Sequence, residues 1–267
     1  MSFNGLFTVD RPIVGMVHLL ALPGAPAYGG DLDALYQRAY DDARTLAQAG
    51  ADALIVENFN DEPFIIGEPA AHDLALMSAV TRDIVRMVSM PVGVNVQFNA
   101  WQAEIAVAHT CGAAFVRVEV FVDRVISAMG VVEPCAPQIT RYRAALGARR
   151  VQLWADIQTK YTTNITPQPL TTSAKEAQAA GADALIVTGA ATGSATPLDA
   201  VVEVKQVAKI PVLVGSGTTI DNAAEVFRIA DGAIVGSSLK ADGRVQNPVS
   251  LGRTRAFIET VRASAHG

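Results

Sequence analysis

The sequence predicts a single (β/α)8 barrel, the TIM-barrel fold class, over residues 1–267. Eight short apolar runs alternate with eight amphipathic segments, which is the pattern of a parallel sheet with right-handed helical crossovers. Half of the residues are hydrophobic and only 6% are aromatic, as in a buried parallel sheet that alanine-rich helices cover. The length of 267 residues also fits one such barrel, which typically has about 250.

A repeated junction supports this fold class. The run AGADALIV occurs at residues 49–56 and again at 180–187, so the same turn from a helix into a strand appears four β/α units apart. Gly-Ala-Asp suits any turn of this kind, so the repeat indicates architecture better than ancestry. An open doubly wound sheet is the alternative, but neither half of the chain has a dinucleotide fingerprint with its acidic ribose partner.

The expected strands are short apolar runs that glycine, proline or polar residues bound. The first helix carries Leu35, Ala39, Ala43 and Leu46 on one face. The strands are expected at residues 13–19, 53–58, 91–99, 115–120, 151–157, 184–188, 212–214 and 233–235. The helices are expected at residues 32–48, 72–88, 101–109, 138–146, 172–180 and 198–208, beyond the turn at 215–219, and at 248–263.

Three local signals refine this assignment. Asp31 is a suitable cap for the first helix, and Gly50 is expected to end it. Thr219 or Asp221 is expected to cap the helix after the seventh strand. The long insertion at residues 121–137, after the fourth strand, is expected to lie over the mouth of the barrel.

Composition excludes several classes of partner. The net charge of −5 and the pI near 5.4 argue against nucleic acid and anionic membranes, and no segment approaches the ~20 apolar residues of a membrane span. The start, MSFNGLFTVDRP, has neither a basic nor an apolar region of a signal peptide, and the two cysteines have no metal or disulfide pattern. We therefore expect a cytoplasmic protein, and we expect it to form a homo-oligomer.

Polar residues stand at the carboxyl ends of the expected strands, where barrel active sites lie. A charge in that position costs free energy unless it is paired or used. Because side chains alternate along a strand, Arg117 and Glu119 are expected to face the lumen together as an ion pair. For the same reason, only one of the neighbours Glu57 and Asn58 can point into the lumen. The set comprises His18, Glu57, Asn58, Asn95, Gln97, Asn99, Arg117, Glu119, Asp156 and Thr188.

These residues suggest roles in acid–base chemistry and substrate binding. A carboxylate at a strand end serves as a general base, a metal ligand or a hydroxyl-binding group. The alternatives are a packing histidine, a structural Arg117 salt bridge and a solvated loop lysine at position 160. The catalytic candidates are His18, Glu57, Glu119, Asp156 and Lys160, and the substrate-binding candidates are Asn58, Asn95, Arg117 and Thr188. Glu57, Glu119 and Asp156 are candidate ligands of Mg²⁺, and no organic cofactor is expected.

Two glycine-rich turns follow the seventh and eighth strands, GSGTT at 215–219 and GSS at 236–238. Turns of this kind aim backbone N–H groups at one point, and the loops after strands 7 and 8 of barrels often bind phosphate. The alternative is ordinary turn and capping chemistry. The sequence therefore predicts a small phosphorylated ligand. Its expected phosphate ligands are Gly189, Gly215, Ser216, Gly217, Gly236 and Ser237.

Seven segments between residues 13 and 258 together resemble the BtpA/SgcQ family: GMVHLLALPGAPAYGG, AGADALIVENFNDEPF, PVGVNVQFNA, RYRAALGA, AGADALIVTGAATG, LVGSGTTIDNA and ADGAIVGSSLKADGRVQNPVSLGR. Each segment alone is common to phosphate-binding barrels. The resemblance implies a TIM barrel similar to the ribulose-phosphate-binding barrels. The chain departs from the family pattern at Glu119, where asparagine is expected, and at Tyr161, where histidine is expected.

The leading functional hypothesis is an enzyme that acts on a phosphorylated sugar or a similar metabolite by isomerase, epimerase or aldol-type lyase chemistry. These reactions need a proton shuttle and enolate stabilisation but no organic cofactor. One alternative is a hydrolase or lyase that cleaves a glycosidic or C–N bond of a nucleotide-like substrate. Another is a non-catalytic assembly or stability factor, which the photosystem I factor among the family's namesakes suggests.

Overall fold

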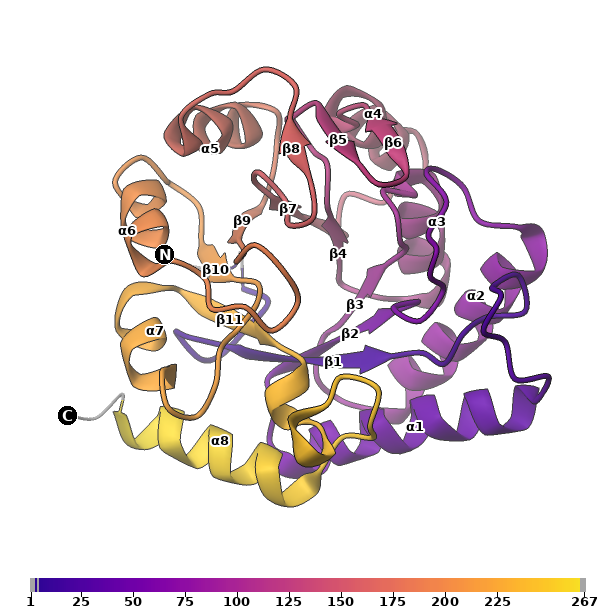
Figure 1. Ribbon diagram of the computed structural model, residues 1–267. Coiled ribbons are helices and arrows are strands. Elements are labelled where there is room, and N and C mark those ends of the chain that lie inside the picture. Colours follow the sequence, from indigo (N-terminus) through magenta and orange to yellow (C-terminus); the bar gives the residue numbers. More distant parts are fainter. Residues whose placement is uncertain (1–2, 4, 265–267) are drawn as a thin grey trace.

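Eight parallel strands close into a barrel in the computed structural model, which describes residues 3 and 5–264 (Figure 1). Around the barrel the strand order is β1-β11-β10-β9-β7-β4-β3-β2. The strands are β1 (Ile13–His18), β2 (Ala53–Glu57), β3 (Val92–Asn95), β4 (Phe115–Val118), β7 (Gln152–Asp156), β9 (Ala184–Val187), β10 (Val212–Val214) and β11 (Gly232–Val235). The predicted (β/α)8 class is confirmed. Residues 1, 2, 4 and 265–267 of the expected single domain lie outside the described residues.

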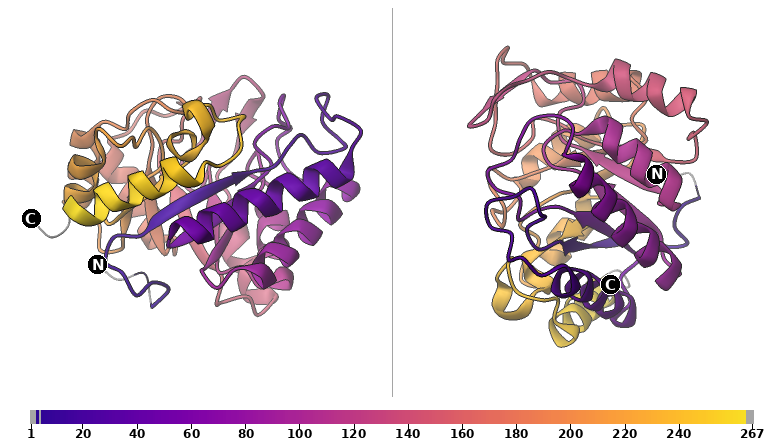
Figure 2. Two further views of the ribbon diagram at one scale, coloured as in Figure 1. Left: turned by 90° about the horizontal axis from the view of Figure 1, so that it is seen from below. Right: turned by 90° about the vertical axis from the view of Figure 1, so that its right-hand side faces the viewer.

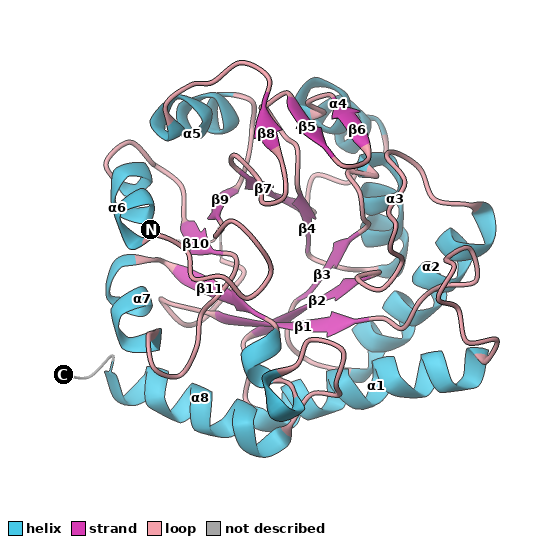
Figure 3. Cartoon of the chain, viewed as in Figure 1, coloured by secondary structure: helices cyan, strands magenta, loops and turns pink. Residues whose placement is uncertain are grey.

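Eight α-helices surround the barrel in the described part of the chain (Figure 3). They are α1 (Leu32–Ala49), α2 (Ala71–Met87), α3 (Trp101–Cys111), α4 (Ala136–Ala145), α5 (Leu170–Ala179), α6 (Leu198–Lys205), α7 (Ala223–Ile229) and α8 (Leu251–Ser264). As predicted, Asp31 caps α1 by accepting a hydrogen bond from the N–H of Ala34, and Gly50 ends it with φ 91°. Within residues 3 and 5–264, every helix is too short or too polar to span a lipid bilayer.

Side-chain alternation divides the barrel into two apolar layers. Inward residues of the strands, such as Met16, Ile55 and Trp154, fill the lumen. Outward residues, including Val116 and Val118, pack against the helices. Continuing the inward parity by two residues toward the carboxyl ends reaches polar side chains on four strands: His18, Glu57, Arg117 and Asp156. The apolar lumen therefore ends in a polar layer.

The start of the helix after β10 was predicted wrongly. The N-terminal cap position of α7 is Asn222, not Thr219 or Asp221. The Asn222 side chain instead closes the preceding turn, because it accepts a hydrogen bond from the N–H of Thr219 and donates one to the carbonyl of Gly217. The turn at 215–219 is thus stabilised by its own amide side chain and does not run directly into a helix.

Strands β3 and β4 are shorter than predicted. β3 ends at Asn95, because the N–H of Gln97 donates to Asn58 Oδ1 and Asn99 adopts φ 58°. β4 ends at Val118, and beyond it the N–H of Val120 donates to Asn99 Oδ1. Side-chain amides thus replace strand pairing at the mouth of the barrel.

The insertion after β4 forms the hairpin β5 (Val125–Ser127) and β6 (Gly130–Val132). β8 (Thr163–Asn164), from the loop after β7, pairs with β5 and completes a three-stranded sheet at this end of the barrel (Figure 1). Beneath it, Phe98, Val120, Val125 and Val132 form a separate buried cluster. The hairpin is therefore anchored by its own small core.

The opposite end of the barrel explains the repeated Gly-Ala-Asp junction. Asp52 and Asp183 each accept a hydrogen bond from an N–H near the start of a neighbouring strand, that of Ile13 in β1 and that of Leu153 in β7. Asp52 also pairs with Arg262, and Asp183 pairs with Arg143. Each aspartate thus joins a strand to a helix, so the repeat has a structural cause. Figure 2 shows the N-terminal segment beneath this end, where the strands begin.

Candidate active site

A small compartment lies at the carboxyl ends of β1, β2, β4, β10 and β11. Its volume is about 40 Å³, whereas a single water needs roughly 10–15 Å³, so it has room for a few waters or a small anion. Three turns contribute its glycines and serines: Gly193, Gly215, Ser216, Gly217, Gly236 and Ser237. Among the described residues, the N–H groups of Gly217 and Ser237 have no hydrogen-bond partner. We call this compartment the glycine cradle.

Two of the six predicted phosphate ligands do not fit that role. The N–H of Gly189 donates to Ser216 Oγ at 2.8 Å, and the N–H of Gly215 donates to the carbonyl of Val187 at 2.8 Å. A Cβ at either position would collide with neighbouring atoms, the backbone carbonyl of Ser194 and the side chain of Ile186 respectively. These glycines allow close packing, and their amides are used within the protein. Of the other four, Ser216 lines the cradle but its Oγ accepts the hydrogen bond from Gly189, and Gly217, Gly236 and Ser237 remain available.

A larger chamber adjoins the cradle, with a volume of about 650 Å³. Four residues line both spaces: Phe59, Arg117, Lys160 and Thr192. The chamber also reaches Glu119 and Gln97, and Ala128 and Met129 of the insertion form part of its wall. The two spaces are therefore neighbours, and both lie at the end of the barrel where the sequence analysis placed the site.

Arg117 pairs with Asp156 and not with Glu119 as predicted. The guanidinium donates from Nε to Asp156 Oδ1 at 3.0 Å and from Nη2 to Oδ2 at 2.9 Å, and both side chains are buried. Burial alone would lower the pKa of Arg117, but the charge and hydrogen bonds of Asp156 outweigh it and raise the pKa. Arg117 therefore stays cationic and is held in one orientation. Asp156 orients this cation and also accepts from Thr159 Oγ1, which argues against its predicted role as a free base.

Glu57 and His18 lie side by side in the cradle. Glu57 Oε2 lies 3.7 Å from His18 Nε2, and Oε1 accepts a hydrogen bond from the side chain of Gln97. The His18 ring stacks on Phe59 with 4.4 Å between ring centroids. Burial, followed by the charges of Lys240 and Lys160, holds the pKa of His18 well below 6.5. The imidazole is therefore neutral near pH 7, and it is able to accept a proton or to donate a hydrogen bond.

Lys160 lies where the two spaces meet. Its Nζ donates to Thr192 Oγ1 at 2.9 Å and lies 5.8 Å from the ring centre of Tyr161. Burial, then the charge of Arg117, lowers the pKa of Lys160, although three nearby carboxylates oppose the shift. This is not the environment of a solvated loop lysine. The group suits a proton donor or an electrophile beside the substrate.

The remaining predicted substrate ligands lie outside both spaces. Asn58 bonds Asp61 and the N–H of Gln97, so it shapes the loop after β2. Asn95 is fully buried and bonds carboxylates, as described below. Thr188 contributes to neither lining, and its Oγ1 has no hydrogen-bond partner in the described part of the chain. The structure therefore brings none of these three residues into the two spaces, because side-chain parity indicates the end of the barrel but not which side chains the neighbouring loops cover.

Asn95 links two buried carboxyl groups, one of which the sequence analysis missed. Its Nδ2 donates to Glu119 Oε1 at 2.7 Å and to Glu104 Oε1 at 3.2 Å, and the N–H of Val96 also donates to Glu104 Oε1. Burial, reinforced by the charge of Glu119, raises the pKa of Glu104 well above 4.5. Burial likewise raises the pKa of Glu119 to about 7. The available signal was a carboxylate on the apolar face of α3, in register with Ala108 and Cys111.

Replacing Glu104 with glutamine should make the protein less sensitive to pH. Both donors point at Glu104 Oε1, while Oε2 has no partner in the described residues, so an amide there reproduces the neutral acid. A carboxyl group whose pKa is raised on folding stabilises the protein at low pH, and this contribution disappears as the pH rises through the folded-state pKa. The wild type should therefore lose more unfolding free energy between pH 5 and pH 8 than Glu104→Gln does.

Urea unfolding at the two pH values measures this difference, with the exposed Glu203→Gln as the control. A Glu104→Gln protein that loses as much stability as the wild type over this range would show that Glu104 is ionised in the fold.

The candidate Mg²⁺ ligands do not form a metal site. Within residues 3 and 5–264, no three histidine, cysteine, aspartate or glutamate side chains lie close enough together to hold a metal ion. Asp156 is bound by the Arg117 guanidinium, whereas Glu119 accepts hydrogen bonds from Asn95 and Asn99.

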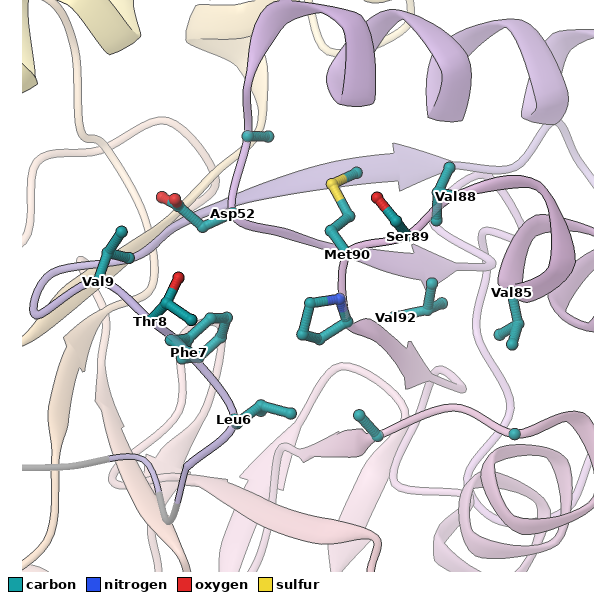
Figure 4. A pocket seen from close by; sticks show the side chains of 14 residues that line it. Leu6, Phe7, Thr8, Val9, Asp52, Val85, Val88, Ser89, Met90 and Val92 are labelled. Atoms are coloured by element: carbon teal, nitrogen blue, oxygen red, sulfur yellow. The ribbon is translucent and has the colours of Figure 1, made fainter.

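A second cavity of about 610 Å³ lies at the opposite end of the barrel (Figure 4). The N-terminal segment from Leu6 to Val9 and the turn from Val88 to Pro91 form its walls. Among the described residues that line it, Asp52 is the one with a charged side chain, and it already bonds Arg262 and the N–H of Ile13. This end of a barrel serves stability more than catalysis, so the cavity is not assigned to the active site.

Comparison with known proteins places the sequence in a family. The model of the BtpA family matches residues 9–263. A Pyrococcus furiosus protein that is described as uncharacterized is 36% identical over 249 residues, which are 93% of this chain and 94% of the relative. The photosystem I biogenesis protein BtpA of Synechocystis is 36% identical over 266 residues, which are 98% of this chain and 91% of that protein.

Solved structures share the fold at low sequence identity. Thiamine phosphate pyrophosphorylase from Pyrococcus furiosus has a TM-score of 0.58 and 16% identity, over 96% of each chain. A 3-hexulose-6-phosphate synthase has a TM-score of 0.59 and 16% identity, over 95% of this chain and 99% of that chain. These likenesses confirm the TIM-barrel fold.

Proposed function

The chain belongs to the BtpA family, and we propose that it is an enzyme acting on a phosphorylated sugar or a similar metabolite. The proposal rests chiefly on the glycine cradle, a space of anion size that Gly217, Ser237 and Lys160 line and in which the N–H groups of Gly217 and Ser237 have no partner among the described residues. Unpaired backbone N–H groups that converge in this way bind anions, and in barrels of this type they hold substrate phosphate.

The reaction class we propose is proton transfer beside a carbonyl group, as in an isomerase, an epimerase or an aldol-type lyase. Glu57 acts as the base, and the neutral His18 beside it is a second proton-transfer group. Arg117, which Asp156 orients, stabilises the enolate oxygen. Its Nη1 has no hydrogen-bond partner among the residues that the structure describes, and the side chain lines both spaces. Lys160 supplies charge or a proton where the phosphate and the reacting carbon meet.

A titration with ribose 5-phosphate and with unphosphorylated ribose tests the phosphate site. We expect the phosphorylated sugar to bind and to raise the melting temperature by mass action. Ser237→Asp places a negative charge against the phosphate and should abolish binding, since Ser237 is half-buried at the edge of the cradle. Ser89→Asp adds the same charge at the opposite end and should bind like the wild type.

Equal binding of ribose and ribose 5-phosphate would contradict the proposal, as would full binding by Ser237→Asp. A scaffold protein without catalytic function would give no exchange of substrate hydrogen with solvent even when the phosphate binds.

A further inference from the structure

The chamber is far more apolar than a bare sugar phosphate requires. Four loops at the mouth direct apolar side chains into it: Phe59 and Phe64 after β2, Phe98 after β3, Met129 from the insertion and Tyr161 after β7. Phe64 and Met129 pack against the buried cluster of Phe98 under the hairpin. These walls are therefore supported by a core and are formed before any ligand enters.

Sugar hydroxyl groups do not suit such walls. A hydroxyl that is buried against phenyl rings without a hydrogen-bond partner loses its hydration and gains nothing in return. An aromatic ring, in contrast, gains contact area and favourable ring geometry beside Phe, Tyr and Met side chains. The chamber volume of about 650 Å³ is also typical of pockets that hold an organic ligand larger than a phosphosugar alone.

Polar side chains line the rest of the chamber wall: Glu62, Gln97, Arg117, Glu119, Thr159, Lys160 and Thr192. Glu119 already accepts hydrogen bonds from Asn95 and Asn99, but a carboxylate has further lone pairs for an N–H donor on a ring edge. The chamber and the cradle share Phe59, Arg117, Lys160 and Thr192, so one ligand can occupy both. Phosphate, sugar and ring would then follow one another from the cradle outward.

We infer that the substrate is a sugar phosphate that carries an aromatic or heteroaromatic ring, with the ring in the chamber between Phe64, Phe98 and Met129. This inference rests on the proposed phosphate site and names the substrate class for it. A nucleoside 5′-monophosphate has the required order of groups and serves as the probe.

Calorimetric titration with the four common nucleoside 5′-monophosphates, ribose 5-phosphate and adenosine tests the inference. At least one nucleotide should bind about tenfold more tightly than ribose 5-phosphate, which corresponds to one aromatic contact of ordinary strength. Phe64→Ala and Met129→Ala, which alter walls from two different loops, should each remove most of this advantage and leave ribose 5-phosphate binding unchanged. Unchanged binding of ribose 5-phosphate also shows that each variant is folded. Leu146→Ala, at the end of α4 on the far side of the barrel, should behave like the wild type.

The outcomes separate this inference from the proposed function. If all nucleotides and ribose 5-phosphate bind equally, the ring inference fails and the phosphate site stands. If adenosine binds as tightly as its monophosphate, the chamber recognises rings but the phosphate site fails. If no phosphorylated compound binds, both fail.

Discussion

Asp156→Asn should lower the free energy of unfolding by about 3–5 kcal/mol, the cost of leaving a buried charge without its partner. Arg117 is 4% exposed and makes both of its side-chain hydrogen bonds in the described structure to Asp156, so the asparagine variant leaves a buried cation without its bidentate partner. Among the described residues, the Arg117 side chain hydrogen-bonds no carboxylate other than Asp156. Urea unfolding at neutral pH measures the loss.

Asp41→Asn is the matched control, because Asp41 and Arg44 form a pair at 3.2 Å in which both side chains are 56% exposed. An exposed pair of this kind contributes about 0–1 kcal/mol. Replacing both Arg117 and Asp156 with apolar residues, as in Arg117→Met with Asp156→Leu, should recover much of the stability. An Asp156→Asn protein as stable as the Asp41→Asn protein would show that Arg117 does not depend on this partner.

Glu57→Gln should slow proton transfer by roughly 10²–10⁴-fold, the usual contribution of a positioned general base. Glu57 is 3% exposed and lies between His18 and Gln97, so the isosteric amide keeps the packing and removes the base. The rate is measured by NMR as the incorporation of solvent deuterium into the sugar phosphate that binds most tightly. Binding itself should be retained, because the phosphate contacts lie on other residues.

Glu203→Gln on the outer face of α6 controls for the loss of a carboxylate and should exchange at the wild-type rate. If Glu57→Gln exchanges as fast as this control, the base is another residue. If both variants and the wild type bind sugar phosphate without any exchange, the protein binds its ligand without this chemistry.

The barrel was predictable from the sequence because the patterns that determine its strands and turns involve residues that are close in sequence. Strand residues alternate between lumen and helix layer, so the parity of Met16, Ile55 and Trp154 also placed His18, Glu57 and Asp156 at one end. The junction at Asp52 and Asp183 repeats because the same hydrogen bond to a strand N–H recurs. The positions of the strands and of these junctions can therefore be read from local periodicity and turn residues, and no contact between distant residues is needed.

The partners of the polar residues depend on contacts that are remote in sequence. Sequence parity brought Arg117 and Glu119 to the same side, but the early end of β4 turned Glu119 toward Asn95 and left Arg117 to Asp156. In the sequence, Gly189 looks like a phosphate-binding glycine. In the structure, the backbone of the loop that contains Ser194 packs against it. The chamber residues Phe64 and Met129 were missed because an apolar residue in a loop looks like part of the core.

The central claim is that the phosphate of a substrate binds at the ends of β10 and β11. A crystal structure of the protein grown with saturating ribose 5-phosphate tests it most directly. Our account predicts the phosphate in the cradle, with hydrogen bonds from the N–H groups of Gly217 and Ser237, and the sugar toward Arg117 and Lys160. A phosphate bound elsewhere, such as the cavity near Asp52 and Ser89, or a cradle that stays free of phosphate at saturation, would contradict it.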